Sequence, residues 1–387
     1  MTSAHLIWRY FLLLFATAPL IYYALATWVA LRFIRRERAR QLAGYTAPVS
    51  VLKPVYGVDF GSYDNFVSFC RQDYPDYEIL FALNDDRDPA LPVIQRIMKE
   101  FPARPIRILI GAEHLGANRK VNNLARMVRE AKHDVLALSD GDVRVGPNYL
   151  REVVARFADP KVGAVTSFYR AISERNIWAQ MEAIGASSDF FPGVLMAEWT
   201  EGIHFALGAA IATTKDWVRK AGGFEAIAGL LADDYELGNR IAKAGGEVVL
   251  SRETVWTMYP AQTFRGFWEH QVRWARTVRL CRPLSYLGLL FTQGLPWTIL
   301  AIVLAPSWRL ATAYALGYFI LRFSVAWAVG IHGINDEVLQ RRIWLVPLRD
   351  AIHFAVWLAS FGSNRVKWGK TEYAIRKGQM VPLNGIE

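Results

Sequence analysis

Residues 10–31 carry no charged side chain, and this run constrains the fold more than any other feature of the sequence. An α-helix needs about 20 apolar residues to cross the hydrocarbon core of a bilayer. We therefore expect a transmembrane anchor over residues 7–32. A cleavable signal peptide has a shorter apolar core and a small-residue cleavage site. Here the run continues directly into RFIRRERAR, so we expect the anchor to remain uncleaved.

Arginines on the two sides of this anchor predict its orientation. Arg9 precedes the run, whereas five arginines follow it closely: Arg32, Arg35, Arg36, Arg38 and Arg40. An excess of Lys and Arg marks the cytoplasmic flank of a membrane helix. The domain that follows the anchor is therefore expected on the cytoplasmic side.

Two later apolar runs, 284–308 and 310–331, predict a transmembrane hairpin over residues 284–331. Arg322 interrupts the second run. Because a charge in the hydrocarbon core is costly, Arg322 is expected to face another helix or a headgroup cavity, or else the span is shallower than these bounds.

Residues 343–362 are apolar but contain Pro347, Arg349 and Asp350. We interpret them as an interfacial or re-entrant segment. Basic residues on both sides favour keeping its two ends on the cytoplasmic side, followed by a cytoplasmic tail over residues 363–387.

The formal charge of +10 favours acidic partners, which include anionic lipid, phosphorylated substrates and nucleic acid. The chain has two cysteines, Cys70 and Cys281, too few for a disulfide framework or a thiolate metal site.

Between the anchor and the hairpin, short β-rich runs alternate with helical periodicity. The expected strands are 49–55, 77–83, 106–111 and 134–140, and the expected helices include 89–101 and 118–131. This alternation predicts an α/β domain with a mostly parallel, doubly wound sheet over residues 45–280. Ligands bind such sheets at the carboxyl ends of the strands.

Carboxylates follow two of these predicted strands. Asp85 comes after the second, and Asp140 and Asp142 come after the fourth. A single Asp at a strand end is usually a turn residue. Turn formation does not explain why two strands deliver acids to one edge, and crowded carboxylates need a cation or a shared proton. We expect Mg²⁺ or Mn²⁺ held by Asp140 and Asp142 together with a phosphate.

Cations for such a phosphate are available nearby. Arg119 and Lys120 begin a predicted helix, where main-chain N–H groups also favour anions. Lys53 ends the first predicted strand. A solvated basic turn remains the alternative for each of these residues.

Two further helices carry candidate residues. Asp233 and Asp234 begin one of them. This pair is either a helix cap or, beside a metal-diphosphate site, the source of a carboxylate that accepts a proton from an attacking hydroxyl. The segment FWEHQVRWARTVR (267–279) contains His270, Arg273 and Trp274. This segment either contributes these side chains to a site or forms a basic amphipathic helix that lies on anionic lipid.

The ordered motifs together resemble a known family. They are VSVLKPVYGVD, FCRQDYPDYEILFALNDDRDPA, NRKVNNL, SDGDVRV, LADDYELG and HQVRWARTVR. In this order and spacing they resemble the membrane-bound family-2 glycosyltransferases, within them the ceramide glucosyltransferase-like branch that also contains bacterial hopanoid glycosyltransferases.

This resemblance implies a GT-A fold, a UDP-sugar donor, a divalent cation and inversion at the anomeric carbon, in a bacterial inner-membrane protein. Asp85 is similar to the family aspartate that contacts uridine, and Asp140 and Asp142 to its metal-diphosphate motif. Asp234 is similar to the catalytic base. Arg273 and Trp274 match the end of the family's Q/R-x-x-R-W motif, which holds the leaving group and the acceptor.

Two positions depart from the family pattern. His270 stands where the last motif has Gln or Arg, and Asp233 stands where the family has Glu before the base. We expect both to support the acceptor side of the site.

The expected reaction is transfer of one hexose, glucose or N-acetylglucosamine, to a lipid hydroxyl, of ceramide or of a hopanoid such as bacteriohopanetetrol. The expected partners are the UDP-sugar donor, the lipid acceptor and the membrane, and no nucleic acid. The alternatives are a processive polysaccharide synthase, which would need more membrane helices, and a non-catalytic basic protein that binds membrane surfaces or nucleic acid.

Overall fold

The computed structural model describes residues 3–41, 44–368, 371–376 and 378–383. The chain divides into two compact units. The sheet unit comprises Ala39–Ile172, Gly202–Pro260 and Arg365–Glu387, and the helical unit comprises Met1–Arg38, Ser173–Glu201 and Ala261–Asn364. Each unit is therefore assembled from segments that are distant in the sequence.

The sheet unit is built on one eight-stranded sheet with the order β3-β2-β1-β4-β7-β6-β8-β5. The strands are β1 Val49–Pro54, β2 Tyr77–Leu83, β3 Ile106–Ile110, β4 Val135–Ser139, β5 Val143–Arg144, β6 Val162–Ser173, β7 Ala210–Thr214 and β8 Glu247–Tyr259. Every residue of β1, β2 and β4 is buried, as expected for strands with both faces covered. The four strands predicted from apolar runs are β1 to β4, each within about a residue of its expected bounds.

The sheet is parallel in its first half and antiparallel beyond β4. β1 pairs in parallel with β2 and with β4, and β2 pairs in parallel with β3. β7 pairs antiparallel with both β4 and β6, and β5 pairs antiparallel with β8. The strand order reverses between β1 and β4, and that reversal creates a crevice at their carboxyl ends.

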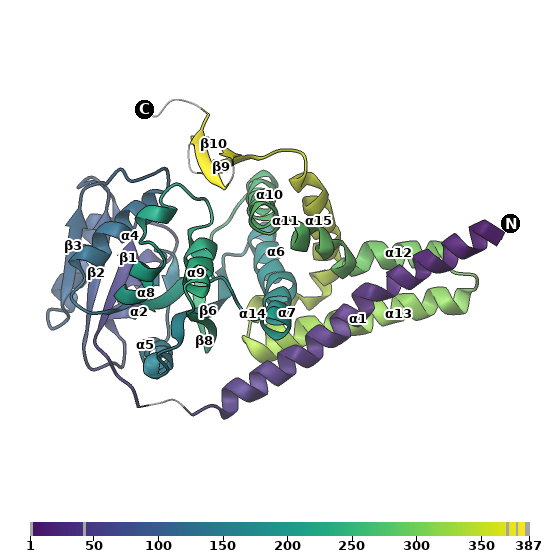
Figure 1. Cartoon of the computed structure of the whole chain (residues 1–387), viewed down its shortest axis with the longest axis horizontal. Coiled ribbons are helices and arrows are strands. Elements are labelled where there is room, and N and C mark those ends of the chain that lie inside the picture. The colour runs from purple at the N-terminus through teal and green to yellow at the C-terminus, as the bar shows by residue number, and fades with distance from the viewer. Residues whose placement is uncertain (1–2, 42–43, 369–370, 377, 384–387) are drawn as a thin grey trace. The chain divides into compact units, whose positions relative to one another are not determined.

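Helices of the sheet unit cover this sheet (Figure 1). They are α2 Ser62–Cys70, α3 Ala90–Glu100, α4 Arg119–Glu130, α5 Tyr149–Val154, α8 Lys215–Lys220 and α9 Asp233–Lys243, with 3-10 turns η1 Ala155–Ala158 and η3 Glu225–Ile227. Asn118 caps α4, since its side chain accepts from the Val121 amide, and α9 begins with acidic residues that suit a helix amino terminus.

A second, three-stranded antiparallel sheet follows at the carboxyl end of the chain, in the segment expected to be only a tail. Its strands are β9 Arg365–Trp368, β10 Thr371–Arg376 and β11 Gln379–Pro382, with β10 in the centre. This sheet belongs to the sheet unit.

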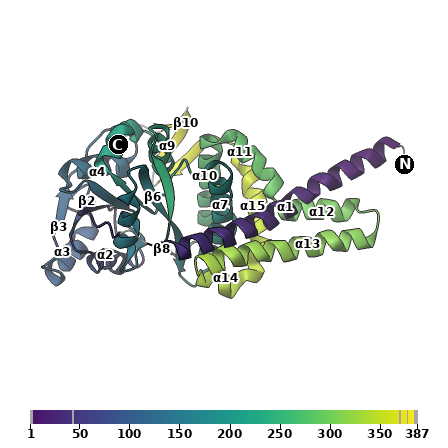
Figure 2. The same cartoon turned by 60° about the horizontal axis from the view of Figure 1, so that its bottom comes forward.

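The helical unit contains the apolar helices. Its elements are α1 Ser3–Ala39, α6 Ile177–Gly185, η2 Ala186–Phe190, α7 Phe191–Glu201, α10 Phe264–Cys281, α11 Pro283–Gly288, η4 Leu289–Thr292, α12 Gly294–Leu304, α13 Trp308–Ala326, η5 Trp327–Gly333, α14 Glu337–Arg342, η6 Ile343–Leu345 and α15 Val346–Ser360. Helices α1, α12 and α13 run side by side in both views, and their contact includes Leu13, Ala301 and Tyr314 (Figures 1 and 2).

Three described helical stretches are long and apolar enough to cross a membrane: His5–Ala39, Trp308–Gly333 and Glu337–Ser360. A fourth is possible if Pro283–Thr292 and Gly294–Leu304, which meet at 49°, form one span. Residues 343–360 of the segment interpreted as interfacial or re-entrant thus lie within a helical stretch of 24 residues, Glu337–Ser360. Its position in a bilayer stays a prediction.

Arg322 faces other helices, which is the first of the alternatives for this residue. It is 2% exposed, and its Nη2 lies 2.7 Å from Asp350 Oδ1 and 2.5 Å from Asp189 Oδ1. The charge is therefore neutralised inside the helical unit, as a buried cation requires.

Candidate active site

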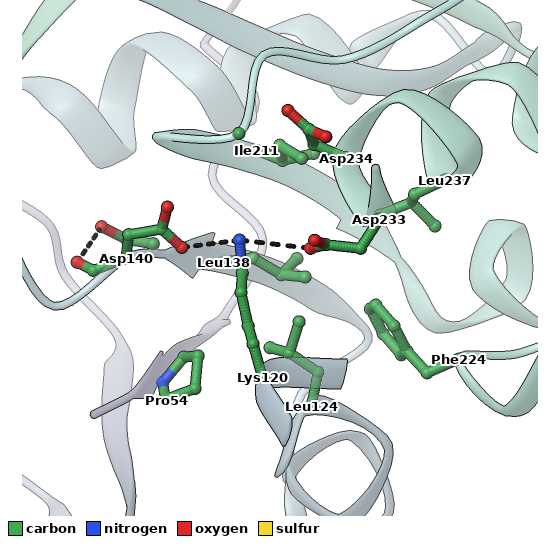
Figure 3. A pocket seen from close by; sticks show the side chains of 12 residues that line it. Pro54, Lys120, Leu124, Leu138, Asp140, Ile211, Phe224, Asp233, Asp234 and Leu237 are labelled. Carbon is green, nitrogen blue, oxygen red and sulfur yellow. Dashed lines mark hydrogen bonds and ion pairs between the residues drawn. The ribbon is translucent and has the colours of Figure 1, made fainter. Parts of the chain in front are cut away.

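The acidic motif lies at the carboxyl end of β4, where the strand order reverses. Asp140 follows directly after β4 and lines a pocket with Lys120, Asp233 and Asp234 (Figure 3). Asp85 follows β2, at the same edge of the sheet, because β2, β1 and β4 are parallel neighbours. The predicted gathering of acids at one edge of the sheet therefore agrees with the strand order.

Lys120 connects two of the acids. Its Nζ lies 2.6 Å from Asp140 Oδ1 and 3.2 Å from Asp233 Oδ2 (Figure 3). Burial alone would lower the pKa of Lys120, but the charges of Asp140 and Asp233 raise it above its ordinary value. Lys120 is thus a fixed cation in the pocket, and the solvated-turn alternative does not describe it.

Asp142 is the second acid of the motif. Burial, followed by the charge of Asp140, raises the pKa of Asp142 to about 7. Burial also raises the pKa of Asp140, against the opposing charge of Lys120. Burial thus disfavours the charged form of both carboxylates, even though Lys120 pairs with Asp140.

A hard divalent cation fits this donor set, because such ions prefer oxygen ligands. Among the residues that the structure describes, no group of three or more His, Cys, Asp or Glu side chains could hold a metal ion. A cation bound by Asp140 and Asp142 would therefore need other oxygen ligands, such as those of a diphosphate and water.

The two aspartates at the start of α9 have different surroundings. Asp233 contacts Lys120, and its Oδ1 accepts from Asn118 Nδ2 at 3.2 Å. Asp234 points to another side of the pocket, where its Oδ2 lies 2.7 Å from the place that a Cβ on Gly208 would occupy. Burial and then the charge of Asp233 raise the pKa of Asp234 to about 6. Asp234 can therefore accept a proton near neutral pH.

Three of the predicted donor-binding residues lie outside the pocket lining. Lys53 is fully buried behind the motif, where its Nζ donates to the main-chain oxygen of Asp140 at 2.7 Å. Burial lowers the pKa of Lys53 to about 7, despite the charges of Asp142 and Asp140. Asp85 and Arg119 are exposed, and Asp85 Oδ1 accepts from the Arg87 amide at 2.8 Å, as in a turn. Contacts of these three side chains with a donor stay predictions.

The residues of the last motif lie on α10 in the helical unit. The His270 ring is 5.3 Å from the Trp274 ring, and His270 Nδ1 contacts the buried carboxylate of Glu182. Burial lowers the pKa of Arg273, while the charge of Glu182 raises it. No ion pair to Arg273 is formed within the described part of the chain, so its guanidinium is available to an anion.

Three partner residues were not predicted from the sequence. Asn118 lies inside the quoted motif NRKVNNL and also at an expected helix start, so a capping argument could have found it. Glu182, which holds His270, and Arg349, whose Nη2 donates to Gln271 Oε1 at 2.7 Å, lie far from α10 in the sequence. No local pattern marks such partners.

A sequence model described as glycosyl transferase family 21 matches residues 11–381. This chain belongs to glycosyl transferase family 21. The match covers nearly the whole chain, including both units and the carboxyl-terminal sheet.

Curated relatives of this family-21 chain confirm the expected ceramide glucosyltransferase-like family. Ceramide glucosyltransferase 1 of Caenorhabditis elegans is 25% identical over 229 residues, which is 59% of this chain and 49% of that protein. Ceramide glucosyltransferase of Gibberella zeae is 32% identical over 142 residues, 34% of this chain and 27% of that protein. The alignment thus spans about half the length of the first of these relatives and less of the second.

A solved structure confirms the GT-A fold. The mannosyltransferase PcManGT from Pyrobaculum calidifontis, in complex with GDP-Man and Mn²⁺, superimposes with a TM-score of 0.59 over 90% of this chain and 99% of that chain. The two sequences are 18% identical, so the likeness concerns the fold alone.

Proposed function

We propose that this chain is an inverting glycosyltransferase that moves one hexose from a UDP-sugar to the hydroxyl of a membrane lipid. The observation that carries the proposal is the Lys120 bridge between Asp140 and Asp233, because it joins the acidic motif to the start of α9, where the candidate base Asp234 lines the same pocket. Family membership and the apolar helices support a glycosyltransferase that works at a membrane.

Asp140 and Asp142 are proposed to hold Mg²⁺ or Mn²⁺. Such an ion would neutralise the diphosphate of the donor and make UDP a better leaving group. The raised pKa values of Asp140 and Asp142 support this role, since burial disfavours their charged forms and a bound cation would stabilise them. PcManGT, which has the same fold, was solved with Mn²⁺.

Asp234 is proposed as the general base. A carboxylate that takes the proton of the attacking hydroxyl can drive a direct displacement, and one displacement inverts the anomeric carbon. Asp233 is bound to Lys120 and Asn118, so we assign it to the support of this site.

Arg273 and Trp274 on α10 are proposed to bind the leaving group and the acceptor. The guanidinium can donate two parallel hydrogen bonds to phosphate oxygens. His270 contacts both Glu182 and the Trp274 ring, so it holds the face of α10 that carries Trp274. Phe190, whose ring lies 6.4 Å from that of Trp274, begins an aromatic and apolar stretch that suits a lipid chain.

The named relatives make ceramide and glucose the first acceptor and donor to test, ahead of a hopanoid and N-acetylglucosamine. The excess of arginines after the first span supports a catalytic unit on the cytoplasmic side.

The test measures UDP release and lipid products from the purified full chain in detergent with UDP-glucose, ceramide and Mn²⁺. We expect one UDP for each monoglycosylated lipid, and loss of turnover in excess chelator with recovery on added Mn²⁺. Turnover that survives the chelator would contradict the metal assignment. Products with many sugars would indicate a polysaccharide synthase instead. No UDP release with ceramide or hopanoid, and with either sugar, would contradict the proposed function.

A further inference from the structure

A short loop, residues 228–230, lies just before Asp233 and Asp234 in the sheet unit. It follows η3 and precedes α9, so no long helix or strand fixes its main chain. Its three successive carbonyl oxygens nevertheless all accept hydrogen bonds from elsewhere in the unit. The position of this loop sets where α9 begins and hence where the two aspartates lie.

Asn118 holds the loop from one side. Its main-chain amide donates to Ala228 O at 2.8 Å, and its Nδ2 donates to Leu230 O at 3.1 Å and to Asp233 Oδ1 at 3.2 Å. The chain packs closely here, because a Cβ on Gly116 would lie 2.4 Å from the carbonyl of Ala228. Asn118 is fully buried and precedes Lys120 by two residues, so this side belongs to the pocket already described.

Strand β11 holds the loop from the other side. The main-chain amide of Met380 donates to Gly229 O at 2.9 Å, and Leu230 forms an antiparallel bridge with Gln379. β11 is an edge strand of the small sheet, so its outward main-chain groups are available for pairing. Gly229 is also close to the Gln379 side chain: a Cβ added to Gly229 would lie 3.1 Å from Gln379 Oε1.

We propose that the carboxyl-terminal sheet is a positioning element of the active site, and that β11 fixes the 228–230 loop so that Asp233 and Asp234 lie correctly in the pocket. This inference rests on the proposed function. Asn118 holds the first and third carbonyls, and β11 supplies the donor for the second. Without β11 the loop is anchored on one face only, and its middle residue is a glycine, which permits many main-chain conformations.

The chemistry explains why such a clamp would affect turnover. A general base must lie within hydrogen-bond distance of the attacking hydroxyl, and a displacement of about 1 Å can cost on the order of 10²-fold in rate. The acidic motif on β4 does not depend on the loop in the same way, because Lys53 and the strand itself hold it. Loss of the clamp should therefore lower kcat much more than it weakens donor binding.

The test compares Met380→Pro with Met380→Leu in the full chain. Proline removes the N–H that reaches Gly229, whereas leucine keeps this donor and nearly the same side-chain volume. We expect Met380→Pro to lower kcat by about 10- to 100-fold relative to Met380→Leu, with donor affinity, measured by calorimetry, within about 3-fold. Hydrogen exchange at residues 228–232 should become faster in Met380→Pro only.

A cross-link separates loss of the clamp from damage to the sheet. Leu230 and Gln379 are directly opposed, and such Cα atoms lie about 4.5–5.5 Å apart, a distance that a disulfide can bridge. In Leu230→Cys/Gln379→Cys/Met380→Pro, we expect oxidation to restore kcat and reduction to lower it again.

The inference is overturned if Met380→Pro retains the kcat of Met380→Leu, or if kcat falls and oxidation does not restore it. Should the unaltered chain transfer no sugar at all, the proposed function fails instead. Hydrogen exchange at residues 228–232 then still decides whether Met380 holds the loop.

Discussion

Asp233 and Asp234 are adjacent in the sequence but differ in their contacts, and this difference carries the first prediction. Asp234→Asn should lower kcat by a factor on the order of 10² to 10⁴ while UDP-sugar and cation still bind, because an amide cannot accept the proton. Asp233→Asn should cost less, since Asp233 binds Lys120 and Asn118. Calorimetric donor affinity and product formation are measured for both. Loss of donor binding in Asp234→Asn would assign that residue to the diphosphate site.

The raised pKa of Asp234 predicts a pH dependence. Only the carboxylate form can act as a base, so kcat/KM should fall as the pH drops through about 6. The charge of Asp233 contributes to the raised pKa, so Asp233→Asn should move this acidic limb to lower pH. Rates measured over a pH series for both proteins check the shift. An acidic limb that stays in place would show that another group controls it.

The role proposed for Arg273 predicts that lysine at this position supports less turnover than arginine. Arg273→Lys should lower kcat by about 10-fold or more, because a planar guanidinium can bind two phosphate oxygens and an ammonium cannot. Arg265→Lys is the matched control on the same helix, since Arg265 is 87% exposed and pairs with Glu269. Near-normal turnover of Arg273→Lys would leave α10 as a membrane-surface helix.

Sequence patterns identify some residues of the site and miss others for a physical reason. Asp140, Asp142 and Lys120 follow from strand ends and a helix start, which are local features. Asn118 binds Leu230 and Asp233 more than 100 positions away, and Glu182 binds His270 across a similar separation. Such contacts depend on how distant segments pack.

Among the helices, α6 and α15 meet through Arg349. A Cβ on Gly185 would lie 2.3 Å from Arg349 Nε, and Arg349 also donates to Gln271 on α10. Gly185→Ala should therefore destabilise the protein by about 1–3 kcal/mol through overpacking and should also lower turnover by displacing α10.

Gly193→Ala on α7 is the matched control for Gly185→Ala, because the described residues place no atom within 4 Å of its added Cβ apart from neighbouring residues of the same helix. It should be neutral or slightly stabilising. Unfolding in detergent and UDP release are measured for both variants. Equal effects of the two changes would contradict the packing argument.

At the scale of elements, sequence patterns predict some of the strands and not others. β1 to β4 follow from apolar runs with helices between them, and the GT-A fold was predicted from the ordered motifs. The antiparallel half of the sheet and the strands β9, β10 and β11 were not predicted individually. In the large sheet, β7 pairs with β4 and β6, and β8 with β5, across long separations, so no short pattern specifies their pairing. In the small sheet each strand pairs with its immediate neighbour along the chain.

At the scale of the whole molecule, the buried ion cluster of the helical unit predicts a large effect on stability. Arg322→Met should destabilise the protein by about 3–5 kcal/mol, because Asp350 would remain buried without the cation that pairs with it, while Asp189 would keep its pair with Arg349. Arg341→Met is the control: its pair with Glu337 is exposed and should be worth less than about 1 kcal/mol. Chemical unfolding in detergent compares them. A similar small loss in both would show that Arg322 is not needed for packing.

The sequence by itself determines the local properties of this protein. Uncharged runs identify candidate spans, apolar runs identify the first four strands, and ordered motifs identify the family and the acids that follow β4. The spans, strands and acids could be predicted because each depends on a few neighbouring residues, and the family because its motifs keep their order along the chain.

Tertiary structure alone decides which distant residues act together. Lys120 contacts both Asp140 and Asp233, and β11 pairs with the loop before α9, because the folded sheet unit brings these segments together. Arg322 interrupts an apolar run in the sequence, where a charge is costly, but in the folded protein Asp189 and Asp350 neutralise it. The physical reason is that short-range contacts between buried charged and polar groups require the packed chain, which no local pattern encodes.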